Sequence, residues 1–286
     1  MSIKIEVASG LGFCSGVKRT IILLEKAAKK EGTIQTLGAV VHNKGVLKRL
    51  ADKGIESVDG IGEIKGGTAA IGAHGVGPET AAALKARAAT VIDTTCPDVR
   101  RVQQLARRLA NDGYFVVVFG DAHHAEVKGI LAHAEGKGMA TRDAAAVAKL
   151  EPVPGRIAAI SQTTNTEQDF KDFVKALFDT TFARDSELLI ADTICRNLRG
   201  RQEATRALAG KVDLMFVVGD KTSANTSRLA ELCARSTETR MVETARDIKA
   251  AWLKGHERIG VTGGASTPEE DIQAVVKRLG ELLKQP

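Results

Sequence analysis

Short β-rich runs alternate with longer amphipathic segments along most of this 286-residue chain, and this alternation is the strongest constraint on its fold. Most of the runs are followed by a turn rich in Gly, Ser or Thr and then by a segment with helical spacing of apolar residues. The expected strands are Lys4–Ala8, Thr33–Leu37, Ala69–Gly72, Thr90–Ile92, Tyr114–Phe119, Arg156–Ile160, Glu187–Ile190, Leu214–Val218 and Ile259–Val261. Strands that alternate with helices predict an α/β fold with parallel sheets.

The cysteines lie in an internal repeat. The tetrapeptides DTTC, which ends at Cys96, and DTIC, which ends at Cys195, each follow a β-rich run and precede a helical segment. A Gln lies seven residues beyond each of them, at Gln103 and Gln202. A looser third copy places Cys14 between a strand and a helix, and the three cysteines divide the chain into near-thirds. The repeat predicts three similar α/β units, each of which donates one cysteine to a shared centre.

We place the units at residues 1–96, 97–194 and 195–286. The first carries Cys14, the second begins just after Cys96, and the third begins with Cys195. Neither a Pro/Ser-rich linker nor a low-complexity tract divides the sequence, so the units are expected to pack tightly against one another.

Composition narrows the class of protein. With 43% apolar and 27% charged residues the chain is too balanced for a disordered or fibrous protein. It has no run of roughly 18 apolar residues that could span a bilayer, and its first ten residues lack the apolar core of a signal peptide. We therefore expect a soluble, cytoplasmic protein with no membrane partner.

The net charge of +6 suits an anionic ligand or an acidic protein partner, although most of it is explained by solvated helix faces. An aromatic content of 3% leaves few side chains on which bases could stack. Nucleic acid is therefore not an expected partner.

Four cysteines in a cytoplasmic chain favour metal binding or catalysis over disulfides, because thiols stay reduced there. A cysteine at a strand-to-helix turn lies where backbone N–H groups and the helix dipole stabilise a thiolate. Structural zinc usually has four ligands and closely spaced Cys pairs, which are absent here. Cys14, Cys96 and Cys195 better suit an iron–sulfur cluster with one iron open to substrate. A single cysteine is more often a small buried apolar residue, and we assign that role to Cys233.

Three histidines, His42, His74 and His124, also lie at the ends of β-rich runs. The carboxyl ends of parallel strands are where open α/β sheets bind ligands, so these imidazoles could pair with an anion or carry protons. Glu126, two residues beyond His124, could donate a proton from a dry pocket. A structural role for each histidine and a surface position for the glutamate are the alternatives.

Three turns rich in small hydroxyl residues follow strands, at residues 161–164, 219–229 and 263–272. Backbone N–H groups and hydroxyls in such turns can bind a phosphate without a P-loop lysine, and the chain has no G-x₄-G-K-[ST] sequence. Helix capping alone is the alternative explanation.

Nine segments, taken in order, extend this picture to a known family. They are GFCSGVKRTI, VVHNKGV, GAHGVGP, DTTCPDV, HHAEVKG, SQTTN, DTICRNLRGRQEA, TSANTSRLAEL and GGASTPE. Together they resemble the motifs of 4-hydroxy-3-methylbut-2-enyl diphosphate reductases, the terminal enzymes of the methylerythritol phosphate route to isoprenoids. The resemblance runs from about residue 10 to residue 272.

The resemblance implies a fold, a cofactor and a reaction. The expected fold is a pseudo-threefold α/β trefoil around one [4Fe-4S] cluster with three cysteine ligands, here Cys14, Cys96 and Cys195. The expected reaction is removal of an allylic hydroxyl from the diphosphate as water, which yields isopentenyl and dimethylallyl diphosphate. Electrons would come from a donor such as ferredoxin or flavodoxin.

The resemblance also implies roles for individual residues. Glu126 would be the proton source, and Thr163 would lie near the substrate hydroxyl, with His124 beside them. The residues expected to hold the diphosphate are His42, His74, His124, Ser223, Asn225 and Ser266.

The sequence departs from the family pattern at Lys18, Lys128, Arg196 and Ala224, the last of which removes one hydroxyl from the phosphate turn. Three alternatives follow. A divergent paralogue could carry the same cluster and reduce another anionic substrate, a non-catalytic sensor could bind the cluster alone, and a structural zinc protein could use the same cysteines.

Overall fold

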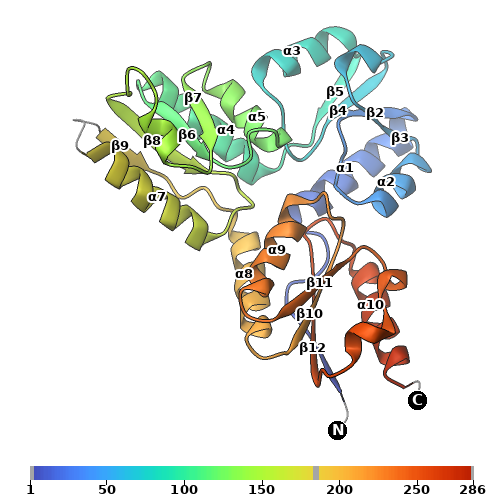
Figure 1. The fold of residues 1–286 in the computed structure, drawn as a ribbon. Helices are drawn as coiled ribbons and strands as arrows, with labels where there is room; N and C mark the ends of the chain where they lie inside the picture. Colours follow the sequence, from blue (N-terminus) through green and yellow to red (C-terminus); the bar gives the residue numbers. More distant parts are fainter. Residues whose placement is uncertain (1–2, 183–186, 285–286) are drawn as a thin grey trace. The chain divides into compact units, whose positions relative to one another are not determined.

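The computed structural model describes residues 3–182 and 187–284, and within these ranges twelve strands form three parallel four-stranded sheets (Figure 1). The chain divides into two compact units. One comprises Met1–Lys18, Val41–Arg49 and Arg196–Pro286, and the other comprises Arg19–Val40 and Leu50–Cys195. Each is described separately below.

The unit that contains Leu50–Cys195 holds two of the sheets. Their strand orders are β3-β2-β4-β5 and β7-β6-β8-β9. The strands are β2 (Ile34–Leu37), β3 (Ile55–Val58), β4 (Thr68–Ile71), β5 (Thr90–Asp93), β6 (Phe115–Phe119), β7 (Gly138–Thr141), β8 (Arg156–Ser161) and β9 (Glu187–Ile190). The helices within this unit are α3 (Pro78–Arg87), α4 (Pro97–Asn111), α5 (Ala125–His133), α6 (Ala145–Ala148) and α7 (Glu167–Thr181), with a 3₁₀ turn η1 (Ile61–Glu63).

The other unit holds the third sheet, in the order β1-β12-β10-β11. Its strands are β1 (Lys4–Val7), β10 (Leu214–Val218), β11 (Glu238–Val242) and β12 (Arg258–Gly263). Its helices are α8 (Arg196–Ala209), α9 (Ala224–Ala234) and α10 (Glu269–Leu282), with 3₁₀ turns η3 (Ala245–Asp247) and η4 (Ala250–Leu253). The helices α1 (Ser15–Glu31) and α2 (Lys44–Ala51) are each divided between the two units.

The three sheets share one topology. In the first two, the strands numbered by their order along the chain lie side by side as 2-1-3-4. The third sheet has the same order if β1 is counted after β12, so that the first strand of the chain is the fourth strand of the last sheet. In each sheet the connections diverge between the two central strands, which is where an open α/β sheet forms a ligand crevice.

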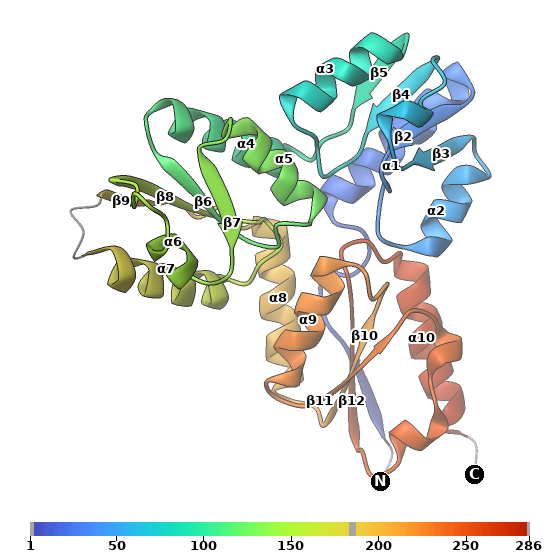
Figure 2. The same ribbon diagram turned by 45° about the horizontal axis from the view of Figure 1, so that its top comes forward.

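Helices cover both faces of the sheet that contains β6 and β8 (Figure 2). Val116 and Val118 of β6 pack against α4 and α5 on one face, whereas Val117 and Phe119 pack against α6 and α7 on the other. A central parallel strand buried on both faces needs a continuous apolar run, which explains the sequence of β6. The same holds for β10, all five of whose residues are buried.

Nine of the twelve strands were expected from the sequence, and their parallel pairing confirms the prediction of three similar α/β units. The three that were not expected, β3, β7 and β11, are all edge strands and are short or rich in polar residues. The other edge strands, β1, β5 and β9, were expected, so an edge position alone does not decide which strands the sequence indicates. The unit boundaries at residues 96 and 194 stay a prediction.

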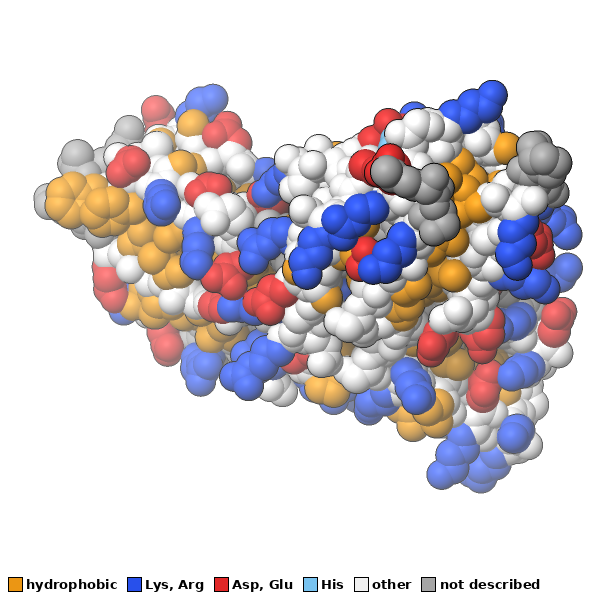
Figure 3. Space-filling model, turned by 90° about the horizontal axis from the view of Figure 1, so that it is seen from below, with side chains coloured by type: hydrophobic (Ala, Val, Ile, Leu, Met, Phe, Trp, Pro, Cys, Tyr) orange, Lys and Arg blue, Asp and Glu red, His pale blue; other side chains and the backbone are white. Residues whose placement is uncertain are grey.

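Basic and acidic side chains are interspersed on the face drawn in Figure 3, as expected for solvated helix surfaces. Among the described residues, no helix is both long enough and apolar enough to cross a membrane.

Phe216 tests the packing of the third sheet, because this residue of β10 is fully buried in a cluster with β12 and α10. We expect Phe216→Ala to lower the free energy of unfolding by about 3–5 kcal/mol, since it leaves a cavity in the core. Phe182→Ala is the control, because Phe182 is 70% exposed, and it should cost about 0.5 kcal/mol or less. Anaerobic urea unfolding followed by circular dichroism measures both; equal losses would contradict this account of the core.

Candidate functional site

Each of the three repeated cysteines follows the fourth strand of its sheet and directly precedes a helix. Cys14 lies between β1 and α1, Cys96 between β5 and α4, and Cys195 between β9 and α8. All are present as thiols. The sequence repeat therefore corresponds to one structural position that occurs three times.

The same backbone hydrogen bond holds each cysteine. The N–H of Cys14 donates to the carbonyl of Ala265 at 3.1 Å, and those of Cys96 and Cys195 donate to Ala73 and Thr163 at 3.0 Å. Each acceptor lies two residues beyond the end of the neighbouring strand, β12, β4 or β8. In each sheet, the backbone just beyond the third strand thus fixes the position of the cysteine that follows the fourth strand.

The sulfur atoms lie at helix starts, where positive dipole ends favour thiolates. Cys96 is the N-cap of α4, and the N–H of Val17 approaches the Sγ of Cys14 at 3.5 Å. The thiol of Cys195 donates to a carboxylate oxygen of Asp98 at 3.1 Å. Burial instead raises the pKa of Cys233 to about 12, which keeps this fourth thiol neutral.

Glu126 and Thr163 meet at the crevice between β6 and β8. One carboxylate oxygen of Glu126 accepts from the N–H of Thr163 at 2.7 Å, and the other accepts from its hydroxyl at 3.0 Å. Burial raises the pKa of Glu126, the negative charge of Asp98 adds to the rise, and the hydrogen bonds from Thr163 oppose it. A carboxyl group whose pKa is raised keeps its proton to higher pH, which suits a proton donor.

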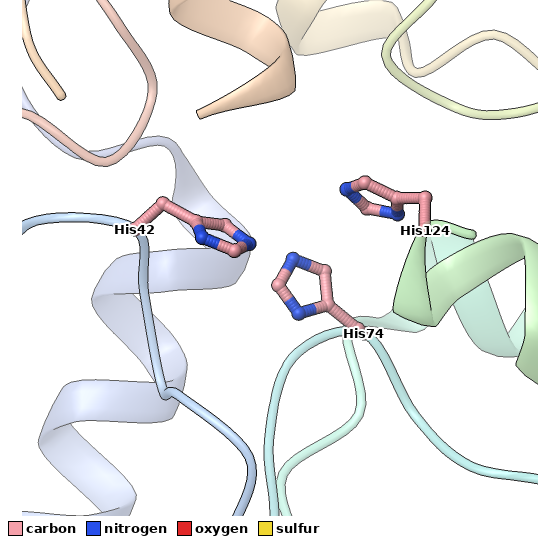
Figure 4. A group of neighbouring side chains, drawn as sticks. All are labelled: His42, His74 and His124. Atoms are coloured by element: carbon pink, nitrogen blue, oxygen red, sulfur yellow. The ribbon is translucent and has the colours of Figure 1, made fainter. Parts of the chain in front are cut away.

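His124 and His74 lie beside this pair in the same unit. Their rings meet edge to face, with centroids 5.2 Å apart and an interplanar angle of 86° (Figure 4). His124 is the N-cap of α5, and its Nδ1 accepts from the N–H of Glu126 at 3.2 Å. Nδ1 is therefore unprotonated, which leaves Nε2 as the nitrogen that can donate to a ligand. His42, also labelled in Figure 4, belongs to the other unit.

Ser223 and Ser266 form the corresponding pair at the crevice between β10 and β12. The hydroxyl of Ser266 lies 3.3 Å from that of Ser223 and 3.3 Å from the carbonyl oxygen of His42. Burial lowers the pKa of His42, and the negative charge of Asp220 opposes this only partly. The imidazole is therefore neutral at pH 7, and can donate one hydrogen bond to an anion.

Asn225 is buried in the first turn of α9, and its amide oxygen and nitrogen have no hydrogen-bond partner among the described residues. A buried amide without partners costs about 1–3 kcal/mol, so a position of this kind marks a group that awaits a ligand. Ala224 lies between Asn225 and the N-cap Ser223, where the family pattern has a second serine.

The three charged departures from the family pattern, Lys18, Lys128 and Arg196, are all exposed. Each lies within the first turn of a helix, in α1, α5 and α8 respectively. None of these three residues is one of the buried hydroxyl or carboxyl residues described above. The departures from the family pattern therefore leave those buried residues in place.

Comparison with known proteins decides the family. The family profile described as LytB protein matches residues 5–280. This chain belongs to the LytB family. A 4-hydroxy-3-methylbut-2-enyl diphosphate reductase of Dehalococcoides mccartyi (strain CBDB1) is 46% identical over 98% of both chains, and that of Geobacter sulfurreducens is 39% identical over 97% of both.

Solved structures of the reductase share the LytB fold of this chain. One, described as the terminal enzyme of the non-mevalonate pathway, has a TM-score of 0.69 at 34% identity and covers 98% of this chain and 99% of its own. The reductase of Plasmodium falciparum has a TM-score of 0.90 at 27% identity and covers 100% and 89%. LytB proteins are iron–sulfur oxidoreductases, so the cysteines at three equivalent helix starts suit the chemistry of this family.

Sequence analysis of this LytB chain did not single out Asp98, Asp220 or Arg201. Asp220 follows β10 directly, and the sequence Gly-Asp at a strand end could have indicated it. Partial burial opposes ionisation of Asp220, but hydrogen bonds from Thr222 and the charges of Lys44 and His42 outweigh it and lower its pKa. No sequence signal indicates Arg201, because the carbonyls that it binds belong to two segments far from it in the sequence.

Glu126→Gln tests the raised pKa. Gln can keep both contacts, because its oxygen accepts from the N–H of Thr163 and its amide donates to the hydroxyl. The unfolded chain loses the proton of Glu126 near the ordinary value of 4.5, whereas the folded protein holds it to higher pH. Wild-type protein therefore loses stability relative to the variant as the pH rises above about 4.5 and through the folded-state pKa. Urea unfolding at a series of pH values measures this; a difference that does not change with pH would contradict it.

Proposed function

We propose that this chain reduces 4-hydroxy-3-methylbut-2-enyl diphosphate to isopentenyl and dimethylallyl diphosphate. The reaction takes up two electrons and two protons, breaks the allylic C–O bond, and releases the hydroxyl as water. We place the enzyme in the cytoplasm, where its substrate is a small soluble diphosphate.

The buried hydrogen-bonded pair of Glu126 and Thr163 is the observation that carries this proposal. Reductive removal of a hydroxyl needs a proton at the leaving oxygen, and burial in a site only 2% exposed raises the pKa of Glu126, which favours its protonated form. Full-length similarity to proteins named for this reaction supports the same assignment. A sensor that only bound a cluster would have no use for a buried proton donor.

Glu126 and Thr163 would act on the hydroxyl end of the substrate. For proton delivery, the protonated carboxyl group of Glu126 would donate to the hydroxyl of Thr163, 3.0 Å away, and this hydroxyl would donate to the leaving oxygen. His124 lies beside Glu126 and can donate from Nε2. Protonation by Glu126 turns a poor leaving group, hydroxide, into water.

The other end of the substrate, the diphosphate, would be bound by Ser223, Asn225, Ser266 and the three histidines. The side-chain amide of Asn225, which has no hydrogen-bond partner among the described residues, supports this, because a phosphate oxygen would accept from its nitrogen. Ser223 lies at the start of α9, whose dipole favours an anion. His42, whose pKa is lowered by burial, would donate as a neutral imidazole, and His74 and His124 would also donate from their rings.

We propose one [4Fe-4S] cluster held by Cys14, Cys96 and Cys195. The donor set suits it, because the three cysteines occupy equivalent helix starts and each backbone N–H is already anchored. The fourth cysteine, Cys233, is fully buried in an apolar cluster and is not a ligand. When bound, such a cluster supplies electrons together with an iron that has no cysteine ligand and is open to substrate.

A small acidic electron-transfer protein such as ferredoxin or flavodoxin would supply the electrons. Helix α4 supports this, because it begins directly after Cys96 and exposes Arg100, Arg101, Arg107 and Arg108 on one face. Asp93 and Glu135 neutralise part of this charge through contacts with Arg100 and Arg107.

The cysteine assignment predicts the iron content of variants. Cys96→Ser should lose most of the protein-bound iron and sulfide, because serine is a poor ligand for this cluster. Cys233→Ala is the matched control and should keep both. Anaerobic purification followed by iron and sulfide analysis tests this; zinc in place of iron, or equal iron in both variants, would reject the assignment.

Turnover tests the proposed reaction. Anaerobic protein is reduced with a viologen, and viologen reoxidation is followed after addition of 4-hydroxy-3-methylbut-2-enyl diphosphate. Glu126→Gln should lower kcat by about 10²- to 10⁴-fold, which is the usual contribution of a general acid. The control is Glu203→Gln, which changes an exposed carboxylate of α8.

A cluster spectrum without turnover in the wild-type protein would reject this substrate. The divergent paralogue would then be the better hypothesis. Unchanged turnover in Glu126→Gln would instead reject Glu126 as the proton source.

A further inference from the structure

Arg201 of α8 is a buried guanidinium, only 6% exposed, whose partners are all backbone carbonyls. Its Nη1 donates to Gly263 at 2.8 Å and to Gly264 at 3.0 Å, and its Nη2 donates to Gly12 at 2.7 Å. Gly12 lies two residues before Cys14, and the two other glycines lead into Ser266. One side chain thus joins the loop of a proposed cluster ligand to the turn of a proposed phosphate ligand.

Arg201 makes no ion pair with a carboxylate within residues 3–182 and 187–284. A buried charge is costly unless an opposite charge compensates it. Burial lowers the pKa of Arg201, and the one charge that opposes this effect is that of Cys14. Arg201 donates to Gly12, two residues before Cys14, so a negatively charged group held by Cys14 would lie close to this guanidinium.

The threefold repeat shows that this cation is not a general requirement of the fold. The residues six positions beyond the cysteines are Thr20, Val102 and Arg201. Thr20 donates its hydroxyl to the carbonyl of Thr94 at 3.0 Å, and Thr94 lies two residues before Cys96 just as Gly12 lies two before Cys14. Two helices thus bind the loop before a cysteine. In α1 the exposed guanidinium of Arg19 also donates to the carbonyls of Thr94 and Thr95 at 3.4 Å, whereas in α8 the guanidinium that binds the loop is buried.

The backbone around Arg201 is built to present these carbonyls. A Cβ on Gly264 would lie 2.2 Å from the hydroxyl of Thr226, and one on Gly263 would lie 2.4 Å from Ile272. Gly12 has a φ of +77°, which other residues rarely adopt. Larger residues would therefore disturb the backbone of both segments, whose carbonyls accept from Arg201.

We propose that Arg201 is a positioning residue with two effects: it fixes the Cys14 loop against the Ser266 turn, and its charge stabilises the added electron on a cluster bound by Cys14. This inference rests on the proposed function, because it assumes that Cys14 is a cluster ligand. The positive charge of Arg201 would affect the reduction potential of the cluster, and its hydrogen bonds would affect the geometry of the diphosphate site.

Two variants separate these effects. Arg201→Gln removes the charge, so the cluster should become harder to reduce and its midpoint potential should shift to a more negative value. Arg201→Lys keeps the charge but loses the fork of donors, so its potential should stay near that of wild type while KM for the diphosphate rises by about tenfold. Arg206→Gln is the matched control, because Arg206 is an exposed residue of the same helix, and it should change neither quantity.

The potential is measured by an anaerobic titration followed by electron paramagnetic resonance, without substrate, and KM is measured separately with viologen as donor. A potential for Arg201→Gln equal to that of Arg206→Gln would overturn the electrostatic part. Wild-type KM in Arg201→Lys would overturn the positioning part. If Arg201→Gln does not fold, a negative shift of potential in Arg201→Lys would also overturn the electrostatic part, since lysine retains the charge.

These outcomes remain distinct from failure of the proposed function. Absence of a cluster in wild-type protein would reject the cysteine assignment itself. A cluster without turnover would reject the substrate, while the potential would still report on Arg201.

Discussion

The hydrogen bond from each cysteine N–H to a carbonyl beyond the neighbouring strand is the interaction on which the site depends. It occurs at Cys14, Cys96 and Cys195 with lengths of 3.0–3.1 Å. Because this bond runs between the ends of two adjacent parallel strands, it places the thiol at the start of a helix and at the edge of a sheet crevice at once. A ligand-binding cysteine is thereby set by rigid elements on either side, even though it lies in a loop.

The crevices of the sheets use the same geometry for different chemistry. The crevice between β6 and β8 brings a carboxyl group and a hydroxyl together, whereas the crevice between β10 and β12 brings two hydroxyls and an unsatisfied amide together. One is suited to proton transfer and the other to binding an anion. The repeated fold therefore places side chains at equivalent positions. The residue types at those positions determine whether a crevice suits proton transfer or anion binding.

The sequence was sufficient to predict the class of fold and most of the candidate site. Strands such as β6 and β10 are buried on both faces, so their apolar runs are unmistakable, and the repeated cysteines identify the equivalent turns. The strand β7 was missed, because its four residues, Gly-Met-Ala-Thr, include no β-branched apolar residue and no aromatic one. Arg201 was missed for another reason. Its role depends on carbonyls that only the folded chain brings together, and a carbonyl belongs to every residue type.

The position of β1 has a consequence for how the protein is made. Residue Lys4 pairs with Arg258, so a strand at the beginning of the chain is completed by one close to its end. During synthesis the first strand leaves the ribosome long before its partner exists, whereas the sheets of β2–β5 and β6–β9 can form as their own segments emerge. The Cys14 loop, which is anchored to Ala265, can reach its final place only after Ala265 has been synthesised. Cys96 and Cys195, whose hydrogen-bond acceptors precede them in the chain, can therefore be anchored before Cys14 is. The proposed assembly of a cluster on all three cysteines would thus follow the synthesis of residue 265.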